Sequence, residues 1–432
     1  MRERQYDVVV VGGGMAGIAA GIAAARAGAR TLLLERYGFL GGMATAGMVG
    51  TICGLYLAGA DGGAERLNGG LAGELADAIE RLPGSAPPRR CGRTVVVPYL
   101  AHELAALADD LVAAERRLDA HLHAHVDGVE RDGVRVAAVR FATADGMRSV
   151  ACSAAVDASG DAVAALAAGA PTETPPPDER QLCSLIFTLQ GVDVAALGGA
   201  AGLALRRRLA AAEAAALLPA GASDVAWRPT GRPGEVAVKL ALRAVGGGAR
   251  EDFRSAAERA GRRRLRALVD FLRADAPAFA AAFVSQVAPQ VGVRESRRII
   301  GRARLTRADV LGGRRFPDAI ARAAWPIELW RHGAAGARFE YLADGAWYEI
   351  PLACLHAAGV PNLFAAGRCI SGTSEALGSA RVIGTCLATG AAAGTAAARV
   401  AGGAAAAGDA PPAADREPTP AAGATARDES SG

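Results

Sequence analysis

The sequence has few aromatic residues and little net charge for its length. Phe, Trp and Tyr make up 5% of the 432 residues, and the formal net charge is +4. So small a positive excess gives little support to binding of nucleic acid or of an anionic membrane. The basic run at residues 262–266 lacks interleaved aromatic side chains that could stack on bases, so we interpret it as a solvated helix face. We therefore expect no nucleic-acid partner.

Cysteines are also few and scattered. The seven cysteines lie at least fifteen residues apart, so no CxxC pair occurs. This spacing argues against a zinc knuckle, an iron–sulfur cluster or a redox dithiol. An odd, unclustered set is typical of reduced thiols and predicts a cytoplasmic protein. His121, His123 and His125 alternate as they would on one face of a strand, and we favour a solvent-facing strand edge over a metal site.

The apolar segment near the N-terminus, residues 6–35, is not a continuous hydrophobic run. A membrane-spanning helix needs roughly 20 apolar residues, but Gly12–Gly14 interrupt the segment, and each Gly costs a helix about 1 kcal/mol relative to Ala. A secretion signal needs a cleavage site followed by a polar start, whereas residues 30–35 continue as a second apolar strand. We therefore expect no membrane partner.

The same segment has the pattern of a nucleotide-binding unit. Residues 7–11 are β-branched and continuous, like a strand buried on both faces of a parallel sheet. A GxGxxG turn at residues 12–17 follows, then an Ala-rich stretch at 16–27 that suits a helix, and a second apolar strand at 31–34 that ends at Glu35. This order predicts adenine-dinucleotide binding. A glycine-rich turn in another kind of α/β protein is the alternative.

Each glycine of the turn has a physical task. Gly12 allows the tight turn, Gly14 lets the backbone approach a pyrophosphate, and Gly17 permits close packing of helix on strand. The N–H groups at the start of the helix favour phosphate. Glu35 can accept hydrogen bonds from ribose hydroxyls, and its charge disfavours a 2′-phosphate.

The rest of the chain predicts a divided molecule. Residues 128–158 read as strands separated by two Asp-Gly turns. Three prolines at 175–177 mark a boundary, and the middle section then mixes strands, at 181–189 and 235–245, with helices, at 195–218 and 252–274. We predict a first nucleotide-binding part at 1–172, a substrate or cap domain at 173–345, a second nucleotide-binding part at 346–400 and a disordered Ala/Pro-rich tail at 401–432.

Four stretches follow one another from roughly residue 5 to residue 400: VVVVGGGMAGIAAGIAAARAGARTLLLERYGFLGGMATAGMVG, AVDASGDAVAALAAGAP, PQVGVRESRRIIGRARLTRADVLGGRRFPDAI and YEIPLACLHAAGVPNLFAAGRCISGTSEALGSARVIGTCLATGAAAG. Together they resemble the FAD-dependent oxidoreductase family of the glutathione-reductase-like flavoprotein fold. The resemblance implies an α/β fold: a Rossmann-like FAD-binding domain, with a parallel sheet, helices and a β-meander, plus an inserted α+β substrate domain.

The resemblance also implies that FAD is the cofactor. Its ADP half would lie at Gly12, Gly14, Gly17 and Glu35. The other FAD contacts implied by the matching motifs are Ala16, Arg36, Gly41, Gly42, Thr45, Asp157, Gly160, Asp161, Gly367, Arg368 and Val382. Histidines that the family often carries near the flavin are replaced by Ser374 and Leu377, which predicts noncovalent FAD.

The start of the last helix, near residues 379–382, is placed by the resemblance beside the flavin ring. A helix N-terminus stabilises negative charge by roughly 0.3–1 kcal/mol, and by up to about 2 kcal/mol when partly buried. This position would therefore favour reduced, anionic flavin. The alternative is a small-residue helix that only packs tightly under a sheet.

Two motifs that are missing from the sequence limit the possible reactions. No second strand–GxGxxG–helix unit appears, which argues against a pyridine-nucleotide domain, and the missing dithiol argues against disulfide reduction. We expect hydride-type transfer between FAD and a small organic substrate bound by the middle domain, with oxygen, a quinone or a carrier protein as the other electron partner. The catalytic candidates are Arg381, Arg294 and His356; arginine suits a carboxylate, and histidine a base.

Two other functions stay open. A flavin monooxygenase or halogenase could use the same fold, although the WxWxIP signature of flavin halogenases is missing and residues 325–330 read WPIELW. A non-catalytic flavoprotein subunit would need the same binding motifs. For the candidates themselves, the segment around Arg294 can be read as an interdomain salt bridge, and each lone histidine as a structural residue.

Overall fold

The computed structural model describes residues 5–59, 63–243, 252–333 and 336–403. The tail predicted to be disordered lies outside the described residues from position 404 onward. The glycine triplet at residues 246–248, which lacks the GxGxxG spacing, also lies outside them.

The main sheet contains the two predicted N-terminal strands. It has seven strands in the order β8-β2-β1-β11-β10-β9, and β22 pairs with β11. β1, β2, β8 and β22 run parallel to their partners, so their carboxyl ends meet at one edge. The strands are β1 (Tyr6–Val11), β2 (Thr31–Leu34), β8 (Leu118–His121), β9 (His125–Asp132), β10 (Arg135–Thr143), β11 (Gly146–Asp157) and β22 (Leu363–Ala365).

The long strand β11 joins the parallel part of this sheet to the β-meander. Residues 146–151 pair antiparallel with β10, and residues 152–157 pair with β1. Gly133 and Gly146 have φ values of +57° and +112°, which suits the predicted Asp-Gly turns because glycine enters this region at little steric cost. The predicted α/β fold with a meander is confirmed.

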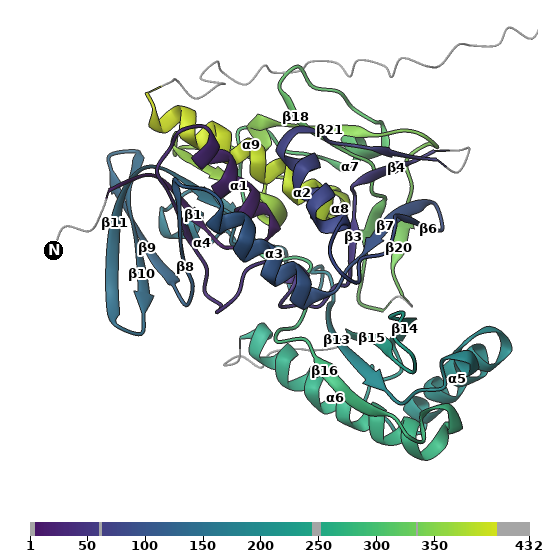
Figure 1. Cartoon of the computed structure of the whole chain (residues 1–432). Coiled ribbons are helices and arrows are strands. Elements are labelled where there is room, and N and C mark those ends of the chain that lie inside the picture. Colours follow the sequence, from purple (N-terminus) through teal and green to yellow (C-terminus); the bar gives the residue numbers. More distant parts are fainter. Residues whose placement is uncertain (1–4, 60–62, 244–251, 334–335, 404–432) are drawn as a thin grey trace, which may run out of the picture.

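Two helices pack unusually closely on this sheet. α1 (Met15–Arg26) and α9 (Ile383–Ala401) lie side by side in Figure 1. A Cβ atom on Gly390 would stand 2.1 Å from the carbonyl oxygen of Ala16, and one on Gly394 would stand 2.0 Å from that of Ala20. The small residues of α9 therefore let the backbones of the two helices touch, which fixes where α9 begins.

The inserted α+β part has a core of its own and lies at the lower right of Figure 1. We call it the cap. Its antiparallel sheet has the order β14-β15-β13-β16. Its elements are β13 (Cys183–Gln190), α5 (Gly199–Ala214), β14 (Val225–Pro229), β15 (Val236–Leu242), α6 (Phe253–Asp275) and β16 (Phe283–Val287).

The cap core is narrower than the predicted domain at 173–345. Apart from Met48, its buried residues lie between Cys183 and Val293. From Leu305 onward the chain packs into the main core, because β18 (Ala319–Ala323) pairs with β21 (Tyr348–Pro351) beside α9. The second half of the predicted middle domain therefore returns to the nucleotide-binding body.

The remaining elements are short and surround these two bodies. The strands are β3 (Thr51–Cys53), β4 (Tyr56–Ala58), β5 (Ala64–Arg66), β6 (Arg89–Cys91), β7 (Thr94–Pro98), β12 (Thr172–Glu173), β17 (Arg298–Ile299), β19 (Ile327–Leu329) and β20 (Arg338–Glu340). The α-helices are α2 (Gly70–Glu80), α3 (Ala101–Ala113), α4 (Val163–Ala167), α7 (Arg307–Leu311) and α8 (Ser374–Ala380); the 3₁₀ turns are η1 (Gly42–Ala44), η2 (Val194–Leu197), η3 (Pro277–Phe279), η4 (Leu352–Cys354) and η5 (Gly367–Cys369).

The alternating histidines do not share a strand, so that prediction was wrong. β8 ends at His121 and β9 begins at His125. Between them His123 has a φ of +52°, so the chain turns there instead of continuing extended. Among the described helices none is long and apolar enough by itself to cross a membrane; α8 and α9 pass that test only as a pair bent by 95°.

Candidate functional site

A cavity of about 830 Å³ lies at the carboxyl edge of the parallel strands. The residues that follow β1, β2, β11 and β22 all line it. One face of the cap sheet closes it through residues of β13, β14 and β15, and the small sheet of β3, β7 and β6 contributes further lining. Ligands of α/β proteins bind at this edge of the sheet, and the volume suits a bound organic molecule.

The glycine turn after β1 forms one end of the cavity. Gly12 has a φ of +102°, and a Cβ there would stand 2.6 Å from the carbonyl oxygen of Ala158, so only glycine fits. Gly14 is different: the nearest atom to its Cβ position is the Cα of Gly42, at 3.7 Å. Gly12, Gly14 and Ala16 line the cavity. Gly14 is also the N-cap of α1 and supplies no side-chain cap, so the first N–H groups of α1 remain available to a phosphate.

Gly17 has a packing role and does not line the cavity. A Cβ on it would stand 1.7 Å from the carbonyl oxygen of Gly12 and 3.3 Å from the Cβ of Ala158. The absence of a side chain therefore lets α1 lie against the turn from which it starts. We had placed Gly17 beside the cofactor, and the structure places it one layer behind.

Glu35 lies in the cavity wall with its carboxylate already holding the loops around it. It accepts hydrogen bonds from the N–H of Gly13 at 2.6 Å and from the N–H of Tyr37 at 2.9 Å, and it is only 5% exposed. Each carboxylate oxygen has a second acceptor position that can meet a ribose hydroxyl. Arg36 also lines the cavity, stacks on the Tyr37 ring and donates to Gln290 at 3.1 Å.

A second glycine loop approaches the first. Gly41 donates its N–H to the carbonyl of Gly13 at 2.8 Å, and a Cβ on Gly42 would stand 2.8 Å from the Cα of Gly14. Both glycines have positive φ and line the cavity. Thr45, which we had placed at the cofactor, does not line it. Its hydroxyl donates to the Leu40 carbonyl at 2.7 Å, so it shapes the loop from behind.

The turn after β11 is held by Asp157 and presents Asp161. Asp157 is fully buried and accepts from the N–H and hydroxyl of Ser159 and from the N–H of Ala165. Burial raises the pKa of this carboxyl. Asp157 does not line the cavity. In this structure it stabilises the turn, although it was predicted to contact the cofactor. Gly160 and Asp161 do line the cavity.

Asp161 connects three parts of the chain. Its carboxylate lies 3.0 Å from Arg368, 2.8 Å from Arg254 of the cap helix α6, and 2.6 Å from the Ser296 hydroxyl. Burial alone would raise its pKa, but Arg368 and Arg254 together hold the pKa well below the ordinary value. This ion pair places the Arg368 guanidinium in the cavity wall beside Gly367.

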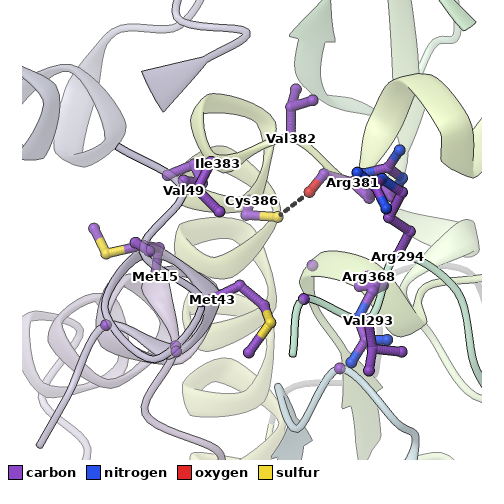
Figure 2. Close-up of a pocket in the computed structure, with 18 of the residues that line it drawn as sticks. Met15, Met43, Val49, Val293, Arg294, Arg368, Arg381, Val382, Ile383 and Cys386 are labelled. Atoms are coloured by element: carbon purple, nitrogen blue, oxygen red, sulfur yellow. Dashed lines mark hydrogen bonds between the residues drawn. The ribbon is translucent and has the colours of Figure 1, made fainter. Parts of the chain in front are cut away.

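The junction of α8 and α9 forms the other wall of the cavity, as Figure 2 shows. Val382 is the N-cap of α9 and provides no side-chain cap, so the first N–H groups of this helix are also available. Cys386, one turn later, donates its thiol to the Arg381 carbonyl at 3.2 Å, and burial raises its pKa to about 12. Arg381 lies directly before this helix start, with Arg294 beside it in Figure 2.

His356 is not part of the site. It is fully buried, its ring stacks on Phe364 at 4.6 Å between centroids, and its Nε2 lies 3.0 Å from the Pro361 carbonyl oxygen. It is not among the residues that line the cavity. We therefore withdraw it as a candidate base; the alternative we had noted, a structural histidine, describes it.

Many residues of the cavity wall were not predicted from the sequence, and three of them bear on the chemistry of the site. They are Lys239 of β15, Trp325, and Glu328 of β19. Glu328 accepts a hydrogen bond from the indole of Trp325 at 3.2 Å and from that of Trp330 at 2.6 Å. A signal was present for Lys239, because it is the only lysine in the sequence and it interrupts an otherwise apolar strand.

These features fit an adenine-dinucleotide flavin. The glycine backbone and the uncapped start of α1 suit the pyrophosphate, the carboxylate at the end of β2 suits the ribose, and the uncapped start of α9 suits a ring that becomes anionic on reduction. The cavity joins all three features and continues under the cap.

The comparison with solved structures returned distant likenesses. One is a geranylgeranyl bacteriochlorophyll reductase-like protein from Thermoplasma acidophilum, with 16% identity over 92% of this chain and 78% of that chain and a TM-score of 0.44. A second is CabE, an aromatic hydroxylase from angucycline biosynthesis, with 12% identity over 93% of this chain and 63% of that chain and a TM-score of 0.48. A third is the anhydrotetracycline hydroxylase OxyS from Streptomyces rimosus, with 14% identity over 93% of this chain and 63% of that chain and a TM-score of 0.45. This chain spans less than two thirds of either hydroxylase. With TM-scores below 0.5, these likenesses carry no argument about function.

The comparison with curated protein sequences returned no match. A family profile described as FAD dependent oxidoreductase matches residues 7–409, which is nearly the whole chain. The match covers both glycine loops, the turn after β11, the cap and the α8–α9 junction. This protein therefore belongs to the FAD-dependent oxidoreductase family, and FAD is its cofactor.

Proposed function

We propose that this oxidoreductase transfers two electrons, as a hydride equivalent, between a small organic substrate and noncovalently bound FAD. The observation that carries the proposal is the continuity of the cavity, which runs from the glycine cradle of α1 to the start of α9 and the cap sheet. FAD supplies a group that accepts or donates a hydride equivalent when it is bound. A substrate under the cap would lie in the same enclosed space.

The chain itself contributes charge and enclosure to this reaction. The free N–H groups at the start of α9 favour negative charge that develops nearby. The cap strands β13 and β15 cover the cavity with apolar residues such as Ile186 and Ala237. Excluding water in this way strengthens each electrostatic contact inside the site.

Noncovalent attachment is supported by the residues at the predicted histidine positions. Ser374 and Leu377 are not among the residues that line the cavity, and Leu377 is buried in the main core. Neither position therefore offers an imidazole to the flavin. The other electron partner is proposed to be oxygen, a quinone or a carrier protein.

The proposal is tested by anaerobic mixing of the purified holoprotein with a substrate panel. We expect at least one small organic substrate to bleach the flavin absorbance without added nicotinamide cofactor, or to reoxidise chemically reduced flavin. A flavin that is reduced only by NADH or NADPH, followed by incorporation of oxygen into the substrate, would contradict the proposal and establish a monooxygenase. A flavin that stays redox-inert toward every substrate and donor would indicate a non-catalytic subunit.

A further inference from the structure

The part of the cavity wall that faces the cap carries an excess of positive charge. Arg294, Arg381 and Lys239 all line it, whereas Glu328 is the carboxylate set among them. Within this cluster of four residues, three cations against one anion leave an excess of two positive charges. Although burial opposes ionisation of Glu328, Arg381 and Arg294 hold its pKa below the ordinary value, so it stays charged.

The two other carboxylates that act on these arginines are already engaged. Glu295 lies 3.1 Å from Arg298 and accepts from the N–H of Gln181 at 3.1 Å. Asp224 lies 2.5 Å from Arg243. Neither carboxylate is among the residues that line the cavity. The excess charge is therefore not neutralised by side chains within the described part of the cavity wall.

The guanidinium of Arg381 is only weakly satisfied. Its Nε is buried and has no hydrogen-bond partner among the described residues. The two hydrogen bonds recorded for it, to the Gln181 side chain and the Glu328 carbonyl, are long, at 3.5 and 3.4 Å. A buried donor without an acceptor costs free energy, and an anionic ligand would remove that cost.

The other two cations both lie over the ring of Trp330. The Lys239 Nζ lies 4.2 Å and the Arg294 Cζ 4.4 Å from its centroid. The indole N–H of Trp330 is bonded to Glu328, and Arg294 donates to the Leu182 carbonyl at 2.5 Å. The positions of both cations are therefore fixed before any ligand arrives, which lowers the entropic cost of binding one.

We infer that the substrate of this site carries a carboxylate, which binds among Arg381, Arg294 and Lys239. The inference rests on the proposed function, since it names the chemical class of that substrate. An arginine presents two parallel donors to a carboxylate, whereas an ammonium acts as a point charge. The apolar and aromatic lining beside the cluster, including Trp325 and Phe339, suits the uncharged part of such a molecule.

The first test compares acids with their neutral amides on the oxidised holoprotein. Benzoate, phenylacetate and hexanoate are titrated beside benzamide, phenylacetamide and hexanamide, and binding is followed by flavin absorbance and tryptophan emission. We expect at least one acid to bind about tenfold or more tightly than its amide. If none of the three acids binds better than its amide, the inference is overturned.

The second test uses the single lysine as a reporter. An amine-reactive reagent at limiting concentration is applied with and without the best acid, and modification of Lys239 is quantified by mass spectrometry. We expect the acid, but not its amide, to slow modification several-fold. Equal modification rates with acid and amide would contradict a carboxylate beside this amine.

Variants then test whether Lys239 and Arg381 of this cluster cause the preference for acid over amide. Lys239→Met and Arg381→Met should each lose about tenfold in affinity for the acid and little for the amide, whereas Lys239→Arg should keep most of the preference. Arg207→Ala, on the exposed face of α5, removes a charge away from the cavity and is the control. Variants that shift the flavin potential but keep the full acid preference would assign the cluster to the cofactor and overturn the inference.

Failure of the inference and failure of the proposed function give different results. If uncharged substrates bleach the flavin and acids show no preference, the proposed reaction stands and the inference of a substrate carboxylate is contradicted. Acids that bind tightly and protect Lys239, in a protein whose flavin no substrate reduces or oxidises, would preserve the anion site and contradict the proposed reaction.

Discussion

At the scale of single residues, two glycines of the same fingerprint do different work. Gly14 has φ −70° and ψ 176°, and the space at its Cβ position opens into the cavity. We expect Gly14→Val to fold, because any residue adopts this backbone, but to weaken FAD binding by at least about tenfold, or 1.4 kcal/mol. FAD content after gel filtration and the melting temperature of the apoprotein measure the two effects separately.

Gly17→Ala is the contrasting variant. Its new Cβ would meet the carbonyl oxygen of Gly12 at 1.7 Å, so we expect the apoprotein to lose at least about 1–3 kcal/mol of stability. A Gly14→Val protein with full FAD occupancy would show that the phosphates bind elsewhere. A Gly17→Ala protein as stable as wild type would contradict the packing role.

The carboxylate of Glu35 should bind both protein and cofactor. We expect Glu35→Ala to weaken FAD binding by about 1–3 kcal/mol, which is the usual cost of removing a hydrogen bond to a charged group. Because the carboxylate also accepts from Gly13 and Tyr37, the apoprotein should lose stability as well. Equilibrium dialysis of FAD and thermal unfolding of the apoprotein check the two effects. Unchanged FAD affinity would remove the ribose contact.

Lys239 should make anion binding depend on pH. Burial first, and then the charge of Arg294, lower its pKa to about 8, while Glu328 and Cys53 oppose the shift and Arg381 adds to it. A lysine with a lowered pKa is protonated below about pH 8 and neutral above it. We therefore expect the affinity for the best-binding acid to be highest below pH 8 and to fall as pH rises through that value.

The Lys239→Met variant is the control for this dependence. Arg294 keeps its charge over the same interval, because its pKa, although lowered by burial, is about 10. Isothermal titration from pH 6.5 to 9 should therefore show a sloping affinity in wild type and a flat one in the variant. A slope of equal size in both would assign the titration to another group.

At the scale of elements, the contact between α1 and α9 sets the geometry of the site. Both helices begin at the cavity, and both lack a side-chain cap. Their relative position is fixed by the close approach of Gly390 to Ala16. A shift of either helix would move one phosphate-binding or flavin-binding N-terminus relative to the other.

This contact predicts the sign of the change in the free energy of unfolding when Gly390 is replaced by alanine. Replacing a glycine within a helix by alanine ordinarily stabilises by up to about 1 kcal/mol. Gly390→Ala should instead destabilise by about 1–3 kcal/mol, because the new methyl would overlap the Ala16 carbonyl. Gly402→Ala, at the other end of α9 where the nearest atom lies at 3.5 Å, should change stability by less than about 0.5 kcal/mol. Denaturant unfolding of both variants decides; a stabilised Gly390→Ala would show that the helices separate freely.

At the scale of the whole molecule, two cores share one cavity. The Asp161–Arg254 ion pair joins the turn after β11 to the cap helix α6, and the cap sheet supplies Lys239. Cofactor and substrate are thus expected to contact different cores. We propose that the flavin is held without a covalent bond, so we expect purified protein to be yellow and to release FAD on acid or heat denaturation. Flavin that remains on the denatured chain would contradict only the noncovalent part.

Local sequence patterns predicted much of the nucleotide-binding part of the molecule. The strand at 31–34 was predicted to the residue, and the Gly12–Glu35 unit and the Asp-Gly meander fold as expected, because these features depend on burial periodicity and turn chemistry within some thirty residues. Gly17, Thr45 and Asp157, which were predicted to contact the cofactor, lie behind the cavity wall for one shared reason. A motif says which residues build a loop, but not which of their side chains face the ligand and which support it from behind.

The sequence by itself therefore determined the fold, the family and the cofactor, since each rests on contiguous motifs whose physics is local. Only the tertiary structure decided the substrate side of the cavity. Lys239, Arg294, Glu328 and Arg381 come from four segments up to 142 positions apart, and none carries a local signature of its partners. Their charges act on one another only because the cap sheet and the α8–α9 junction bring them together in a buried space, where a charge is screened far less than in water.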